Sequence, residues 1–153
     1  MKIRDILKPE CIIEDMRAEN KRDALAELSA RIRQIQSNCD SDAMLKVLLE
    51  REKLGSTGIG EGIAIPHGKI KGLDDMVISF GRSRNGIDFE ALDNRPAHLF
   101  FLLLAPEESA GKHLKALAKI SRMLKDKTFR KMLMDAKSGA DLYRMILDKD
   151  DSG

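Results

Sequence analysis

One histidine, His67, stands out as a group that could do chemistry, because its neighbours hold it on a stiff turn. Pro66 fixes the entering backbone and removes one amide donor, and Gly68 removes side-chain bulk. Free imidazole has a pKa of about 6.5, so a neutral nitrogen nucleophile is abundant near neutral pH and could accept a phosphoryl group. A structural histidine in a turn is the more common explanation of Pro-His-Gly, so these three residues alone leave both readings open.

Two further residues could complete a phosphoryl site, which needs positive charge and hydrogen-bond donors around the phosphate oxygens. Arg51 falls in the last turn of a predicted helix, from which its guanidinium could fold over the following loop. His113 falls in the first turn of a later helix, where backbone N–H groups favour anions. Both residues also have structural explanations, a helix C-terminal cation for Arg51 and a packed core histidine for His113. The loop offers further donors: Ser56, Thr57, Gly58 and Gly68.

The glycine-rich stretch before the histidine matches neither common nucleotide-binding pattern. The G-x-G-x-x-G fingerprint fails because Ile63 occupies the place of its last glycine. A P-loop fails because five residues, one too many, separate Gly62 from Gly68, and Ile70 stands where Ser or Thr is needed. The sequence therefore predicts no nucleotide cofactor.

Metal and serine-nucleophile chemistry have equally little support. The histidines lie far apart in sequence, with no pair at i, i+4 spacing: His67, His98 and His113. No G-x-S-x-G segment is present. We expect neither a metal site nor an organic cofactor.

Length and composition indicate the size, the surface character and the compartment of the protein. The 153 residues fit one domain, and 27 basic against 25 acidic residues give a net charge of +2. The absence of Trp and the single Tyr argue against a nucleic-acid surface. Cys11 and Cys39 lack metal-ligand spacing and suggest a reducing compartment. With no signal-peptide core and no apolar run of about 18 residues, a cytoplasmic protein is expected, with only indirect membrane association.

Apolar residues at helical spacing predict helices over residues 21–35, 41–54, about 110–125, about 127–136 and about 139–149. Asn20 and Ser41 are the expected N-caps of the first two helices, and Gly55 is expected to end the second. A single helical turn over residues 3–7 is expected to stop at Pro9.

Short strands are predicted at residues 11–13, 63–65, 76–80 and 98–104. The first is expected at a sheet edge, and the last, which is nearly all apolar, at the centre. Asn85-Gly86 predicts a type I′ turn into residues 87–89, and the rest of residues 55–72 is expected to be loop. The predicted fold class is α/β: a single-domain sandwich with a small mixed β-sheet flanked by helices on both faces.

Two runs of sequence around His67 are similar to a known signature. Residues 51–60 read Arg-Glu-Lys-Leu-Gly-Ser-Thr-Gly-Ile-Gly, and residues 62–69 read Gly-Ile-Ala-Ile-Pro-His-Gly-Lys. Together they resemble the active-site signature of the fructose/mannitol class of enzyme IIA domains, which belong to the bacterial phosphoenolpyruvate-dependent phosphotransferase system (PTS). The likeness covers nearly the whole chain and is greatest with the nitrogen-regulatory branch of that family.

The resemblance implies a single EIIA type-2 domain over residues 1–153, with a mixed sheet flanked by helices. It implies that His67 is the phosphorylated residue, and that Arg51 and His113 line the site and stabilise the phosphoryl group. A phosphocarrier protein of the HPr or NPr type is the implied donor, and no metal or cofactor is expected.

Three functions remain open on this resemblance. The first is a nitrogen- or potassium-linked regulator, whose phosphorylation state sets its binding to regulatory target proteins. The second is a sugar-transport component that passes phosphate to a IIB domain. The third is a binding module without transfer activity. Regulation is favoured over transport because the chain carries no fused IIB or membrane domain, and intact Arg51, His67 and His113 argue against the inactive module.

Overall fold

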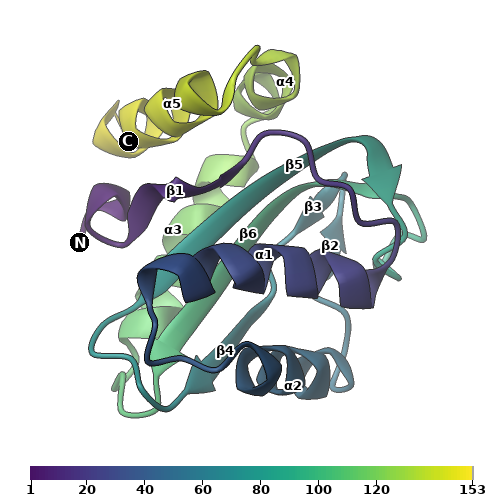
Figure 1. Ribbon diagram of the computed structural model, residues 1–153. Coiled ribbons are helices and arrows are strands. Elements are labelled where there is room, and N and C mark those ends of the chain that lie inside the picture. Colours follow the sequence, from purple (N-terminus) through teal and green to yellow (C-terminus); the bar gives the residue numbers. More distant parts are fainter. Residues whose placement is uncertain (153) are drawn as a thin grey trace.

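Two long antiparallel strands form the middle of the molecule (Figure 1). The computed structural model describes residues 1–152. Strand β5 (Val77–Ile87) pairs with β6 (Ala97–Pro106), and Phe80 lies opposite Phe101 in their register. Strand β6 is nearly all apolar and almost wholly buried, and the first seven residues of β5 are buried too, as expected of strands covered on two faces. The prediction of a central strand within residues 98–104 is confirmed.

Shorter strands extend this pair into a six-stranded mixed sheet of order β1-β5-β6-β3-β2, with β4 also paired to β6. Strand β1 (Leu7–Ile13) runs parallel to β5 at one edge. Strands β3 (Ile63–Ala64) and β4 (His67–Ile70) follow one another along β6, both parallel to it. Strand β2 (Gly58–Gly60) pairs with β3 at the other edge.

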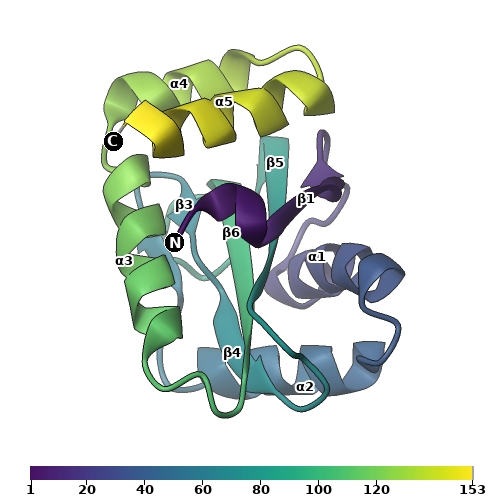
Figure 2. The same ribbon diagram turned by 90° about the vertical axis from the view of Figure 1, so that its left-hand side faces the viewer.

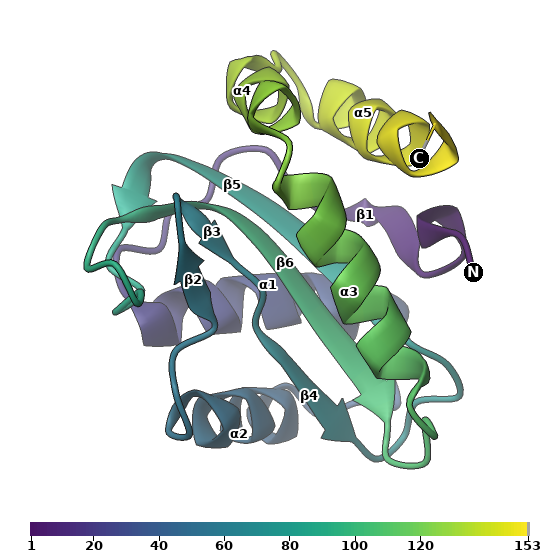
Figure 3. The ribbon, with the colours of Figure 1, turned by 180° about the vertical axis from the view of Figure 1, so that it is seen from behind.

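Helices cover both faces of the sheet, so the predicted α/β sandwich is confirmed (Figures 1 to 3). Helices α1 (Lys21–Ile35) and α2 (Ser41–Glu52) lie on one face. Helix α3 (Lys112–Leu124) crosses the other face, in front of β6 in Figure 3. Helices α4 (Lys127–Asp135) and α5 (Gly139–Ser152) pack along the β1–β5 side. In the described part of the chain, no helix has the length and apolar character that a membrane span requires.

Helix caps follow the sequence closely, with two corrections. Helix α2 ends at Glu52 with Lys53 as its C-cap, two residues before the end predicted from Gly55. Asn20 caps α1 by accepting a hydrogen bond from the Asp23 amide at 2.9 Å, as predicted. The predicted cap Ser41 is instead the first helical residue of α2. The carboxylate of Asp40 caps that helix, accepting from the Ala43 amide at 3.2 Å. Both residue types cap well, so sequence alone placed this boundary one residue late.

The predicted type I′ turn at Asn85-Gly86 is wrong, because β5 continues through it to Ile87. A type I′ turn needs positive φ at both central residues. Gly86 has φ +86°, but Asn85 does not adopt this conformation. The strand instead has an irregular register between Arg82 and Ile87, which is typical of a β-bulge.

The glycine-rich stretch was predicted to be loop apart from a strand at residues 63–65. Strand β3 confirms that strand, but β2 and β4 lie where loop was predicted. The backbone of this stretch completes the free side of β6: Gly62 accepts from the Leu99 amide at 3.0 Å, and Pro66 accepts from the Leu103 amide at 2.9 Å. A buried central strand needs partners for its amides on both sides, and this tertiary requirement overrides the local turn signals.

The N-terminal segment also differs from its prediction. The helical turn spans Ile3–Asp5 only, and β1 begins at Leu7, so Pro9 lies inside a strand. Proline is tolerated there because β1 is an edge strand, as predicted for residues 11–13. The thiol of Cys11 is buried and unpaired, and burial raises its pKa to about 11.

A buried hydrogen bond joins the N-terminal turn to the last helix, α5. The buried carboxylate of Asp150 on α5 accepts a hydrogen bond from the Ile3 amide at 2.7 Å. Its other oxygen lies 2.6 Å from the ammonium group of Lys119 on α3. This N–C clasp joins three elements that are far apart in sequence.

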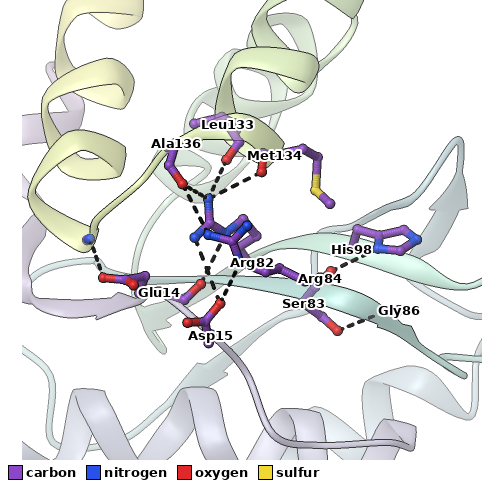
Figure 4. Close-up of polar contacts among 11 residues, drawn as sticks. Glu14, Asp15, Arg82, Ser83, Arg84, Gly86, His98, Leu133, Met134 and Ala136 are labelled. Carbon is purple, nitrogen blue, oxygen red and sulfur yellow. Dashed lines mark hydrogen bonds and ion pairs between the residues drawn. The ribbon is translucent and has the colours of Figure 1, made fainter.

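Arg82 on β5 is fully buried and fastens the end of α4 to the sheet (Figure 4). Its guanidinium donates to the backbone carbonyls of Glu14, at 3.1 Å, and Leu133, at 2.9 Å, and also to that of Ala136. The carboxylate of Asp15 lies 3.9 Å away. Charge-assisted hydrogen bonds of this kind stabilise a buried cation that would otherwise be unfavourable.

We expect Arg82→Met to lower the free energy of unfolding by on the order of 3 kcal/mol, because the carbonyls of Glu14 and Leu133 lose this donor. Urea unfolding followed by circular dichroism measures this change. Arg84→Met is the matched control, since the Arg84 side chain is 51% exposed on the same strand, and it should cost only about 0.5 kcal/mol. Equal stability of the two variants would show that the buried hydrogen bonds contribute little.

Candidate functional site

The three residues singled out from the sequence line one small open pocket. It has a volume of about 180 Å³ and lies where the end of α2, strand β4 and the start of α3 meet. A larger groove of about 700 Å³ between α1 and α2 has lining residues of both charges but no histidine or cysteine. The smaller pocket therefore holds the candidate chemistry, and its lining residues are Arg51, His67, Gly68, Lys69, Leu103 and His113.

His67 is the first residue of β4 and is partly buried, which corrects the expected exposed turn. Its Nδ1 lies 2.8 Å from the carbonyl oxygen of Ile65. Because a carbonyl can only accept, Nδ1 carries the proton in this contact, and the lone pair is on Nε2. The backbone thus selects one tautomer and orients the ring.

The strand conformation of β4 explains the residues next to His67. Side chains alternate along a strand, so His67 and Lys69 share a side while position 68 faces the other way. A Cβ on Gly68 would lie 2.6 Å from Cγ1 of Val47 on α2. Gly68 lines the pocket, but its lack of a side chain is required by the packing of α2 rather than by an approaching partner. Lys69 was given no role from the sequence, because residues 66–69 were expected to be loop.

Arg51 lies in the last turn of α2, and its Nη1 donates to the carbonyl oxygen of Gly55 at 3.0 Å. The guanidinium therefore folds back over the start of the loop, as expected. Its fork carries five N–H groups, so further donors remain for an anion in the pocket.

His113 enters the pocket from the first turn of α3 and is partly buried. Its Nδ1 lies 2.8 Å from the hydroxyl oxygen of Ser109. Burial lowers the pKa of His113, and the positive charge of Lys69, together with that of His67 when its ring is protonated, lowers it further. When Ser109 donates to Nδ1, the imidazole proton is on Nε2, where it can serve as a neutral hydrogen-bond donor.

The lowered pKa of His113 predicts a pH-dependent stability. The folded protein binds the ring proton more weakly than the unfolded chain, in which histidine titrates near 6.5. The stabilisation is therefore complete above about pH 6.5 and is lost as the pH falls through that value toward the folded pKa. Urea unfolding across this range should show a smaller loss of stability in His113→Gln than in the wild type. An unchanged pH dependence in this variant would contradict the prediction.

Three of the four predicted loop donors, Ser56, Thr57 and Gly58, do not line the pocket. The Ser56 hydroxyl bonds to the Phe89 carbonyl at 3.3 Å and accepts from the Gly58 amide at 3.0 Å. Thr57 is buried, and both its amide and its hydroxyl donate to the carboxylate of Glu52. These residues shape the loop, and their donors are already used. No sequence pattern indicated a role for Glu52, because its contacts depend on the fold.

Metal ligands do not gather in or near the pocket. Within residues 1–152, no three His, Cys, Asp or Glu side chains are placed to hold a metal ion. His98 lies on β6, where its Nδ1 contacts the carbonyl of Ser83 at 2.8 Å. It does not line the pocket with the other two histidines.

The pocket therefore presents a nucleophilic imidazole surrounded by donors and cations. Arg51 and Lys69 supply positive charge, and His113 supplies a further donor. A phosphoryl group carries charge on three oxygens, and cations and fixed hydrogen-bond donors stabilise that charge. The arrangement suits phosphoryl transfer to and from a histidine.

Comparison with known proteins defines the class. The sequence model of the family "Phosphoenolpyruvate-dependent sugar phosphotransferase system, EIIA 2" matches residues 5–149. The chain belongs to this family, which makes it a phosphotransfer-related protein.

Individual relatives narrow the position within the family. A nitrogen regulatory protein of Bradyrhizobium diazoefficiens is 41% identical over 146 residues, covering 95% of each chain. The crystal structure of the nitrogen regulatory protein IIA-Ntr from Neisseria meningitidis superposes with a TM-score of 0.87 at 34% identity, covering 94% of this chain and 98% of that one. A fructose-specific EIIABC component of Bacillus subtilis is 38% identical over 90% of this chain but only 22% of its own length.

These relatives confirm the predicted membership of the nitrogen-regulatory branch. A phosphocarrier and regulatory role fits them best, because the two nitrogen regulatory proteins match over nearly their full lengths. The similarity to a fructose-specific component also supports the sugar-transport alternative, although this chain matches only about a fifth of that larger protein.

Proposed function

We propose that residues 1–153 form one EIIA domain in which His67 accepts a phosphoryl group on Nε2 and passes it on. The last residue, Gly153, lies outside the described part of the chain. The observation that carries the proposal is the pocket that places Arg51, Lys69 and His113 around His67. The hydrogen bond from Nδ1 to the Ile65 carbonyl supports Nε2 as the attacking atom.

In the proposed step, the Nε2 lone pair attacks the phosphorus atom of a phosphohistidine on a donor protein. The new N–P bond forms as the donor's N–P bond breaks, and that electron pair returns to the donor imidazole. The Nδ1 proton stays in place, and the Ile65 carbonyl stabilises the positive charge that develops on the ring. Arg51 and Lys69 offset the charge of the transferred oxygens. The proposed donor is a phosphocarrier of the HPr or NPr type.

The proposed output is regulation, in which the phosphorylated and free forms bind target proteins differently. The high identity with a nitrogen regulatory protein over 95% of both chains supports this choice. Transfer to a IIB domain for sugar uptake is the alternative, supported by the match to a fructose-specific component. We place the protein in the cytoplasm, since both cysteines are free and buried.

The test is the mass of the intact protein after incubation with phosphoenolpyruvate, enzyme I and an HPr-type carrier. The proposal predicts the gain of one phosphoryl group, which is lost on acid treatment. A purified IIB domain added afterwards separates the two outputs, because only the transport reading predicts rapid transfer to it. No uptake from a donor proven active would favour a binding module without transfer activity.

A further inference from the structure

Glu52 is a buried carboxylate for which the transfer chemistry gives no reason. It is the last residue of α2, and its side chain is only 4% exposed. A negative charge at this position faces the negative end of the helix macrodipole, which is unfavourable. Burying a carboxylate is also costly unless donors surround it. The burial of this carboxylate therefore has to be explained by the donors that surround it and by their connection to the pocket.

The carboxylate binds three donors from two segments. Oε1 accepts from the Thr57 amide at 3.1 Å and pairs with the Lys21 ammonium at 3.0 Å, while Oε2 accepts from the Thr57 hydroxyl. Thr57 is itself 4% exposed, so these bonds are shielded from water. Glu52 thereby fixes both the backbone and the side chain of Thr57.

A chain of hydrogen bonds leads from Thr57 to the histidine. The Thr57 carbonyl accepts from the Ile65 amide at 3.0 Å. The Ile65 carbonyl then faces Nδ1 of His67 at 2.8 Å and holds the proton on that nitrogen. The placement of this carbonyl, which selects the tautomer, depends on Thr57 and so on Glu52.

The preceding residue holds the other end of the same loop. Arg51 donates to the Gly55 carbonyl at 3.0 Å, so two adjacent side chains of α2 grip residues 55–57. A shift of the loop would therefore move the guanidinium and the Ile65 carbonyl together.

We propose that Glu52 is a positioning residue for phosphoryl transfer, acting through Thr57 and Ile65 to fix the tautomer and orientation of His67. This inference rests on the proposed function of His67. In Glu52→Gln, an amide with one acceptor oxygen replaces a carboxylate that serves three donors. If the amide oxygen keeps the Thr57 amide and Lys21, the amide NH2 faces the Thr57 hydroxyl, which has to turn from donor to acceptor. The negative charge that strengthens all three contacts is also lost, so the loop is held less firmly. Misplacement of reacting groups by small distances lowers transfer rates by roughly tenfold to a hundredfold.

The test measures two quantities in the intact chain. The first is the rate of phosphoryl uptake from the HPr-type carrier, which should fall at least about tenfold in Glu52→Gln. The second is the pair of ¹⁵N chemical shifts of the His67 ring at alkaline pH, which report the tautomer. The wild type should show a protonated Nδ1, and Glu52→Gln should show a mixture. Glu50→Gln, an exposed site on the same helix, should change neither quantity.

A second pair of variants keeps the test decisive if Glu52→Gln does not fold. Thr57→Val should shift the His67 signals in the same direction, and Thr57→Ser should restore them. If Glu52→Gln folds and its His67 ring shows wild-type ¹⁵N shifts, the proposal is overturned, whatever happens to the transfer rate. If Glu52→Gln does not fold, wild-type ¹⁵N shifts in a folded Thr57→Val overturn it instead. If the wild type takes up no phosphoryl group, the proposed function of His67 fails. The ¹⁵N shifts then still decide whether Glu52 fixes the tautomer of His67.

Discussion

His67→Ala is expected to take up no phosphoryl group under conditions in which the wild type takes up one. The alanine has no nitrogen nucleophile, and the other groups in the pocket are cations or donors rather than acceptors of a phosphoryl group. His113 is the exception, but its Nδ1 is engaged with the Ser109 hydroxyl. Intact-protein mass after incubation with the donor system measures the loss.

The matched control is His98→Ala, which removes a histidine that does not line the pocket. It should be phosphorylated as fully as the wild type. One acid-labile phosphoryl group on His67→Ala would move the acceptor to another residue and would end the proposed assignment. Circular dichroism of each variant establishes that it is folded.

Arg51→Ala should slow phosphoryl uptake by about 10²–10³-fold, the usual effect of removing a group that stabilises transition-state charge. The guanidinium is a planar cation with several donors that lines the pocket, and it also holds the Gly55 carbonyl. Rapid-quench measurement of the phosphorylated fraction against time gives the rate.

Two companion variants separate charge from geometry. Arg51→Lys keeps the charge but loses the planar fork, so it should recover only part of the rate. Lys53→Ala removes an exposed cation two residues away, which does not line the pocket, and should transfer at the wild-type rate. An Arg51→Ala protein that is as fast as the wild type would remove Arg51 from the site.

The helices of this fold could be predicted because their apolar residues repeat at helical spacing. The bounds of α1 match the prediction at both ends, and α4 and α5 differ from it by a few residues at most. Strand β6 was equally clear, because a continuous apolar run has to be covered on both faces. In these elements, local pattern and tertiary packing favour the same structure.

In the glycine-rich segment only the strand at residues 63–65 was predicted, and β3 confirms it. Strands β2 and β4 were not predicted, because they exist only through pairing with β3 and β6. Glycine has weak strand propensity, so residues 58–60 and 67–70 have no local reason to be extended. The prediction of a turn at Asn85-Gly86 failed for a similar reason. Pairing with β6 keeps β5 extended through Ile87 despite the strong local turn signal.

The site was predictable in its reactive groups but not in their supports. Arg51, His67 and His113 stood out by residue type and by their places in the sequence, and the structure brings them to one pocket. Lys69 was missed because its direction depends on β4 being a strand. Glu52 was missed because its contacts with Thr57 and Lys21 depend on long-range packing.

The N–C clasp has a consequence for the order in which the chain can fold. Ile3 and Asp150 are 147 positions apart, so a growing chain makes the N-terminal turn long before its partner exists. Strand β1 waits as well, since its partner β5 begins at Val77. Closing such long loops is entropically slow, and apolar residues of β1 such as Ile12 stay exposed meanwhile. Residues 3–13 are therefore made before their partners but are among the last to fold, and a chaperone that shields them early is expected to raise the yield of native protein.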